Sequence, residues 1–170
     1  MNFADPKVAA VYAEYEARIA AEKPEIDAAF GSPPLPRAPP IDPNRFLLPV
    51  GPEVGRFLHA LIFARRPSRV LELGTSYGYS ILFLADAARE VGAHVVTIDL
   101  ADYKQAYAAE RIAAAGLTNQ VEFRLGDAVA RSQRLVDGPD EVHRWTVGRN
   151  VIKAYREHGT TASAAGGDLI

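Results

Sequence analysis

The sequence Val70–Ser80, VLELGTSYGYS, decides the fold. A mostly apolar run that contains Glu72 ends at Leu73, two glycines follow at Gly74 and Gly78, and an apolar run resumes after Ser80. Glycine has no Cβ, so it permits unusual backbone dihedrals and the close approach of a ligand to the main chain. The pattern predicts a strand that turns sharply into a helix beside a bound ligand.

The spacing of the glycines in the turn indicates which kind of ligand it can bind. Dinucleotide-binding turns read G-x-G-x-x-G, whereas this one reads G-x-x-x-G, with Ser76 in place of the middle glycine. This spacing favours a ligand that places no pyrophosphate in the turn, and a nicotinamide cofactor is disfavoured. The acidic Glu72 also discourages phosphate and suits a cationic or amino-acid-bearing ligand.

Strand and helix patterns alternate around this turn. Helices of this length between strands imply right-handed crossovers and a parallel sheet. We therefore expect an α/β fold with a Rossmann-like parallel sheet and flanking helices. The expected strands are Arg69–Leu73, His94–Asp99 and Val121–Leu125, and the expected helices are Ser80–Val91 and Tyr103–Ala115.

The flanks of this region have a different character. An N-terminal helix begins at Asp5 and Pro6, and the proline-rich stretch Ser32–Pro43 is an extended connector to a second helix at about 52–64. After Asp127 no β-like run follows, so we expect a sheet truncated after its third strand.

These patterns divide the chain into three parts. Residues 1–47 form a helix and connector, residues 48–128 form the ligand-binding half, and residues 129–170 form an unmatched tail. Within the tail we expect a helix at about 140–156 and then a disordered end.

Two further acidic residues follow strands. Asp99 ends the second strand about twenty residues beyond the turn, where a carboxylate can accept ribose hydroxyls. Asp127 follows the third strand and could reach an adenine amino group. Either residue alone could be a solvated strand-end carboxylate. Together with Glu72 they lie along one crevice of a doubly wound sheet, which favours a nucleoside ligand.

The stretch Leu48–Ala128 resembles class I S-adenosylmethionine-dependent O-methyltransferases of the catechol and caffeoyl-CoA type. The resemblance implies that the turn and Ser80 hold the methionine part of the cofactor, Asp99 the ribose and Asp127 the adenine end. It also implies that the loop Val50–Gly55 closes over the cofactor. The candidate cofactor-binding residues are Glu72, Gly74, Thr75, Gly78, Tyr79, Ser80, Asp99 and Asp127.

The implied activity is in-line methyl transfer to a hydroxyl of a small molecule, achieved mainly by positioning. Metal-dependent relatives carry an aspartate-rich strand resembling DLVFIDADK and a later Asp-Asn pair that bind a divalent cation. No residue here matches these ligands, so we assign no metal site and no catalytic residue, and a role for Mg²⁺ is in doubt. A non-catalytic cofactor-binding remnant is therefore the alternative function.

The tail carries a second resemblance. Gln133–Arg144, QRLVDGPDEVHR, resembles the C-terminal segment of acyl-CoA dehydrogenases, where the residue matching Asp137 is the catalytic base and those around Glu141 lie near the flavin. The flavin-binding body of that family has no counterpart here. The simpler interpretation is a turn and cap before a helix, and a fusion of a methyltransferase to a dehydrogenase tail is a further hypothesis.

The amino-acid composition of the chain limits the kinds of partner that we expect it to bind. The net charge is −2, from 19 basic and 21 acidic residues, which favours neither nucleic acid nor a membrane surface as a partner. The absence of cysteine excludes disulfides, zinc-thiolate sites and thiol nucleophiles. We expect a cytoplasmic protein that acts on a small molecule. A homodimer, in which a second copy covers the edge of the unfinished sheet, stays open as a possibility. His59 and His94 are expected to be structural.

Overall fold

The structure is a computed structural model that describes residues 3–30 and 42–127. None of the helices in these ranges is long and apolar enough to cross a membrane. The elements in chain order are α1 (Pro6–Phe30), the 3-10 turn η1 (Pro43–Arg45), α2 (Pro52–Arg65), β1 (Arg69–Leu73), α3 (Tyr79–Val91), β2 (His94–Asp99), α4 (Asp102–Ala114), the 3-10 turn η2 (Thr118–Gln120) and β3 (Val121–Leu125).

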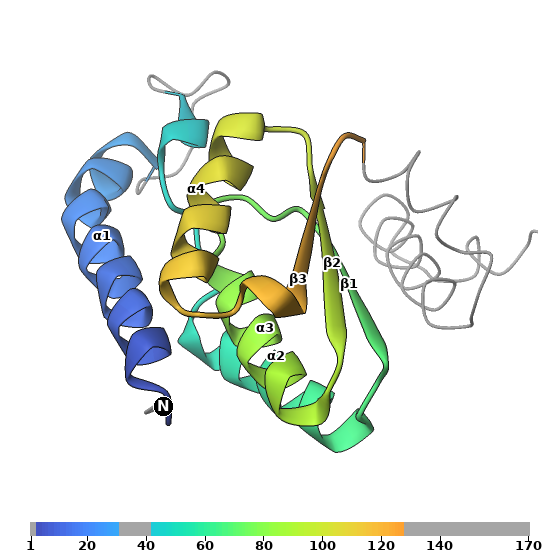
Figure 1. The fold of residues 1–170 in the computed structure, drawn as a ribbon. Helices are drawn as coiled ribbons and strands as arrows, with labels where there is room; N and C mark the ends of the chain where they lie inside the picture. The colour runs from blue at the N-terminus through green and yellow to red at the C-terminus, as the bar shows by residue number, and fades with distance from the viewer. Residues whose placement is uncertain (1–2, 31–41, 128–170) are drawn as a thin grey trace, which may run out of the picture. The chain divides into compact units, whose positions relative to one another are not determined.

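The three strands form a parallel sheet in the order β1-β2-β3, with α3 and α4 as the crossovers. Val70 pairs with Val95 and Val95 with Val121, so the carboxyl ends of the strands lie side by side. Figure 1 shows both crossover helices on the same face of this sheet. The predicted Rossmann-like parallel sheet is confirmed, and all three strands have the predicted bounds.

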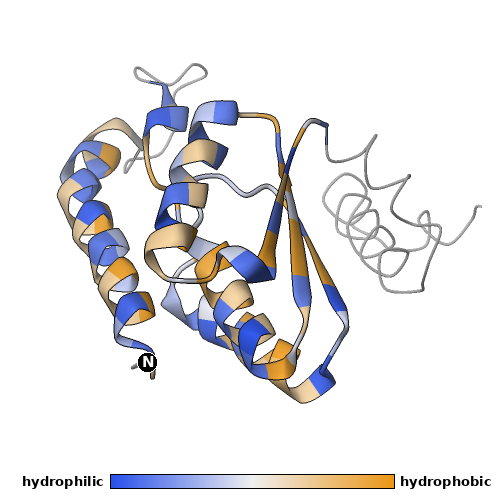
Figure 2. Cartoon of the chain, viewed as in Figure 1, coloured by the Kyte–Doolittle hydropathy of each residue, from blue (hydrophilic) through white to orange (hydrophobic). Residues whose placement is uncertain are grey.

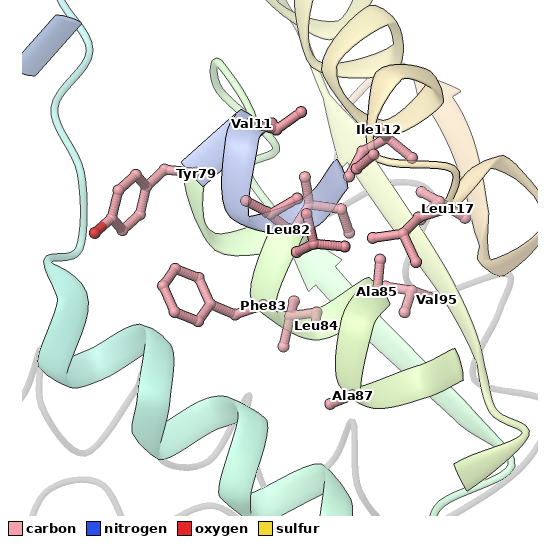
Figure 3. Close-up of a cluster of buried hydrophobic side chains, with 14 of the residues drawn as sticks. Val11, Tyr79, Leu82, Phe83, Leu84, Ala85, Ala87, Val95, Ile112 and Leu117 are labelled. Atoms are coloured by element: carbon pink, nitrogen blue, oxygen red, sulfur yellow. The ribbon is translucent and has the colours of Figure 1, made fainter. Parts of the chain in front are cut away.

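The core lies between the sheet and α3. Helix α3 is buried on almost every side because α1 and α2 cover the part of it that the sheet leaves open. Its residues Ile81, Leu82 and Ala85 have no exposed surface, and Figure 3 shows Leu82 and Ala85 within the core. Figure 2 shows hydrophobic residues on α3 and on the strands that it packs against. Burial of an isoleucine or leucine side chain stabilises a fold by about 1.5–3 kcal/mol.

Helix α1 packs across α3 and α4. Its predicted apolar face is confirmed at Val8, Val11 and Tyr15, which are buried. The Asp5 Oδ1 atom accepts a hydrogen bond from the Lys7 N–H at 2.8 Å, as expected for a residue that caps the first turn. The helix continues through Pro24 to Phe30, well beyond the apolar positions that predicted it.

Three predictions fall outside the described residues. They are the helix at about 140–156, the disordered end and the dehydrogenase-like segment 133–144. The proline-rich connector lies mostly in residues 31–41, which are also outside the described ranges.

Candidate functional site

The turn after β1 has the backbone that its glycines predict. Gly74 and Gly78 have φ values of +97° and +92°, and Ser76 between them has φ +47°. The Gly74 N–H donates to the Ile98 carbonyl at 2.8 Å, and the Gly78 N–H donates to the Thr75 carbonyl at 3.0 Å. The chain therefore leaves the sheet at Gly74 and enters α3 within one tight turn.

The two glycines serve different purposes. A Cβ placed on Gly74 would meet no atom within 4 Å, so open space faces the main chain there. A Cβ on Gly78 would lie 2.7 Å from the Ala108 Cβ and 2.8 Å from the Tyr15 hydroxyl oxygen. Gly78 thus allows α4 and α1 to pack closely against the turn, whereas Gly74 leaves room for a ligand.

Glu72 lies at the centre of a hydrogen-bonded network beneath the turn. The Ser80 hydroxyl donates to Glu72 Oε1 and the Thr97 hydroxyl to Oε2, both at 2.6 Å. The Thr75 and Thr97 hydroxyls are 2.5 Å apart, and both side chains are buried. Burial raises the pKa of Glu72 to about 7 and the charge of Asp99 adds to the rise, although the two hydroxyl donors oppose it.

Asp99 is fixed at the carboxyl end of β2 by two main-chain donors. The Ser76 N–H donates to Oδ2 at 2.7 Å, and the Ala101 N–H donates to Oδ1 at 2.8 Å. Each carboxylate oxygen has a second lone pair, so the group can still accept hydrogen bonds from a ligand. Asp99 therefore links the glycine turn to the edge of the sheet.

The other predicted residues lie around this edge. Leu125 pairs with Asp99, and the Gly126 N–H donates to the Asp99 carbonyl at 2.8 Å, so Asp127 follows directly beyond the same end of the sheet. Asp127 is exposed. Tyr79 is buried and its hydroxyl donates to Glu16 Oε1 at 2.8 Å, so this side chain binds α1.

A cavity of about 80 Å³ lies against the turn. The segment Leu47–Val50 forms its second wall, and sequence reasoning did not single out Leu47, Leu48 or Pro49. The feature that could have pointed to them is the short apolar run FLLPV, which follows the proline-rich stretch. Its apolar residues recur at neither the spacing of a strand nor that of a helix. The lining residues are Leu47, Leu48, Pro49, Val50, Gly74, Thr75, Ser76, Tyr77, Tyr79 and Ser80.

His59 and His94 lie away from this cavity. The His59 Nε2 atom is 3.3 Å from Asp86 Oδ2, and Asp86 also accepts a hydrogen bond from Arg89 at 2.6 Å. This contact joins α2 to α3, in keeping with the predicted structural role. Within residues 3–30 and 42–127, no group of three or more histidine, aspartate or glutamate side chains is arranged to hold a metal ion.

A parallel sheet with this turn and a carboxylate after its second strand defines a Rossmann-like nucleoside-binding fold. The sequence profile of the O-methyltransferase family matches residues 43–143, and the chain belongs to that family. The matched range covers both walls of the cavity and all eight predicted cofactor-binding residues.

Individual relatives agree with this assignment. A catechol O-methyltransferase of Niastella koreensis is 36% identical over 88 residues, which are 52% of this chain and 39% of that protein. The chain thus spans about two fifths of this curated relative.

Solved structures share the fold. Cofactor-bound Rv0187 from MTB has a TM-score of 0.53 and 29% identity, over 79% of this chain and 50% of that one. The O-methyltransferase TomG of Streptomyces achromogenes, solved in complex with SAM, has a TM-score of 0.50 and 28% identity, over 71% and 44% of the two chains.

Proposed function

We propose that this chain binds S-adenosylmethionine and supplies the cofactor-binding half of an O-methyltransferase for small hydroxylated molecules. The observation that carries the proposal is the open main chain at Gly74, in a turn that is joined to Asp99 by the Ser76 N–H and followed by the Ser80–Glu72 pair. Membership of the family supports it, as does TomG, a relative solved with SAM.

The residues of the site fit the two ends of this cofactor. Ligand pockets usually measure about 300–1,000 Å³, so a cavity of about 80 Å³ can enclose only part of such a molecule. The methionine end fits here, because open space faces the main chain at Gly74 and the Ser80 side chain lines the same cavity. The nucleoside would then extend along the sheet edge toward Asp99 and Asp127.

The charges of the site suit a cationic ligand. When bound, S-adenosylmethionine supplies a methyl group on a positively charged sulfur. The chain places two carboxyls, Glu72 and Asp99, beside the turn, and none of the described residues that line the cavity is a lysine or an arginine. Because the pKa of Glu72 is about 7, a nearby positive charge would favour its ionised form and strengthen the attraction.

The acceptor is proposed as a catechol or a related hydroxylated small molecule, since the curated relative is named a catechol O-methyltransferase. The contribution proposed for this chain is to bind and orient the cofactor and to exclude water from its methionine end.

Methyl transfer tests this function directly. The chain is incubated with S-adenosylmethionine labelled in its methyl group and a panel of catechols, with and without Mg²⁺, and labelled product is measured. Labelled catechol ether that depends on the protein supports the proposal. Binding of the cofactor without transfer to any acceptor would favour the non-catalytic remnant, and failure to bind the cofactor would exclude both.

A further inference from the structure

One wall of the cavity lacks secondary structure of its own. Residues 46–50, between η1 and α2, belong to no helix or strand, so their main-chain groups need partners from elsewhere in the protein. Phe46 and Leu47 are nevertheless buried, each with 2% of its surface exposed, while Leu48 and Val50 are exposed. The position of this wall must therefore be fixed by contacts with another element.

Glu22 of α1 provides that contact. The Leu47 N–H donates to Glu22 Oε2 at 2.6 Å, and the Arg18 Nε–H donates to Oε1 at 2.7 Å. The Glu22 and Arg18 side chains are only 19% and 23% exposed, so solvent screens these bonds less than it screens surface pairs. A hydrogen bond from a main-chain N–H to a carboxylate is among the stronger kinds.

The same helix also holds the opposite wall. The Arg18 guanidinium lies 4.2 Å from the centre of the Tyr77 ring, and the Tyr15 hydroxyl donates to the Tyr77 carbonyl at 2.8 Å. Tyr77 is part of the glycine turn and lines the cavity. One face of α1 thus contacts both Leu47 and the turn, although Glu22 is not among the lining residues.

We propose that Glu22 is a positioning residue for the cofactor, which sets cofactor affinity by holding the Leu47 main chain against α1. The inference rests on the proposed function. If the wall is in place for only a fraction of the time, the apparent dissociation constant rises by the inverse of that fraction. A wall held for about a tenth of the time would weaken binding about tenfold.

The test compares four proteins by amide hydrogen exchange at Leu47 and by titration with S-adenosylhomocysteine. Glu22→Ala removes the acceptor, and we expect faster exchange at Leu47 and about five- to tenfold weaker binding. Glu22→Gln keeps an oxygen that can accept from the Leu47 N–H, so it should restore most of the affinity. Asp27→Ala is the matched control, because it removes an exposed pair with Lys23 on the same helix.

Each outcome bears on one claim. Wild-type affinity in Glu22→Ala, with Leu47 exchange unchanged or faster, overturns the inference and leaves the proposed function standing. A wild-type chain that does not bind the ligand overturns the proposed function and with it the role of Glu22. If Glu22→Ala does not fold, Glu22→Lys, which also lacks an acceptor, must show the same loss of affinity, and wild-type binding by that variant would refute the inference.

Discussion

Gly74 and Gly78 have nearly the same φ angle and different surroundings. Both have φ near +90°, where an L side chain is strained, yet only Gly78 has neighbouring atoms in the place of a Cβ. The sharp turn that both glycines form could be predicted from their spacing alone. The split in their roles could not, because it depends on Ala108 and Tyr15, which are distant in the sequence.

Alanine at each glycine separates these roles. Gly78→Ala should lower the free energy of unfolding by about 2–4 kcal/mol, since it adds overpacking to the strain of a positive φ. Gly74→Ala should cost only about 1–2 kcal/mol, because the space beside it is open. Urea denaturation of both variants measures the difference, and equal losses would contradict the close packing at Gly78.

Glu72 should make stability fall as the pH rises. Its folded pKa of about 7 lies above its ordinary value of 4.5, so the folded state binds the extra proton over this window. This contribution to stability is fully present below pH 4.5 and is lost as the pH rises through about 7. The loss is on the order of 1.4 kcal/mol for each unit that separates the two pKa values.

Glu72→Gln checks this linkage, because glutamine keeps the shape of the side chain and does not titrate. Denaturation from pH 4 to 8 should show the variant gaining stability relative to wild type as the pH rises. Asp86, whose pKa burial also raises, is present in both proteins and cancels in the comparison. A difference that does not change with pH would show that Glu72 titrates normally.

At the scale of elements, the strands were predictable and the contacts of α1 were not. Short apolar runs bounded by glycine or acidic residues predicted β1, β2 and β3 with their correct ends. The apolar face of α1 was also visible in the sequence. Its polar contacts with Tyr77 and Leu47 join residues 25 to 62 positions apart, and no local pattern encodes such pairs.

Tyr15→Phe tests how α1 is attached to the turn. The variant keeps the ring in the core but leaves the Tyr77 carbonyl without its buried donor, which should cost about 1–3 kcal/mol. Tyr103→Phe is a suitable control, because Tyr103 is exposed. Thermal unfolding measures both variants, and a Tyr15→Phe protein as stable as its control would mean that this hydrogen bond does not hold α1 in place.

At the scale of the molecule, the described region brings the glycine turn, Asp99 and the Leu47 wall together at the carboxyl end of one parallel sheet. This is the edge at which open α/β sheets bind ligands. The sequence predicted the turn and Asp99 because they follow strands directly. The wall was missed because it owes its position to α1 and not to any period of its own.

Titration calorimetry with S-adenosylhomocysteine tests this account most directly. We predict saturable binding of one ligand per chain, with affinity reduced about tenfold or more in Asp99→Ala, because a hydrogen bond to a charged group contributes about 1.5–3 kcal/mol. Bound ligand should also raise the temperature of unfolding. A folded wild-type chain that shows no heat of binding and no change in its unfolding temperature would contradict the account.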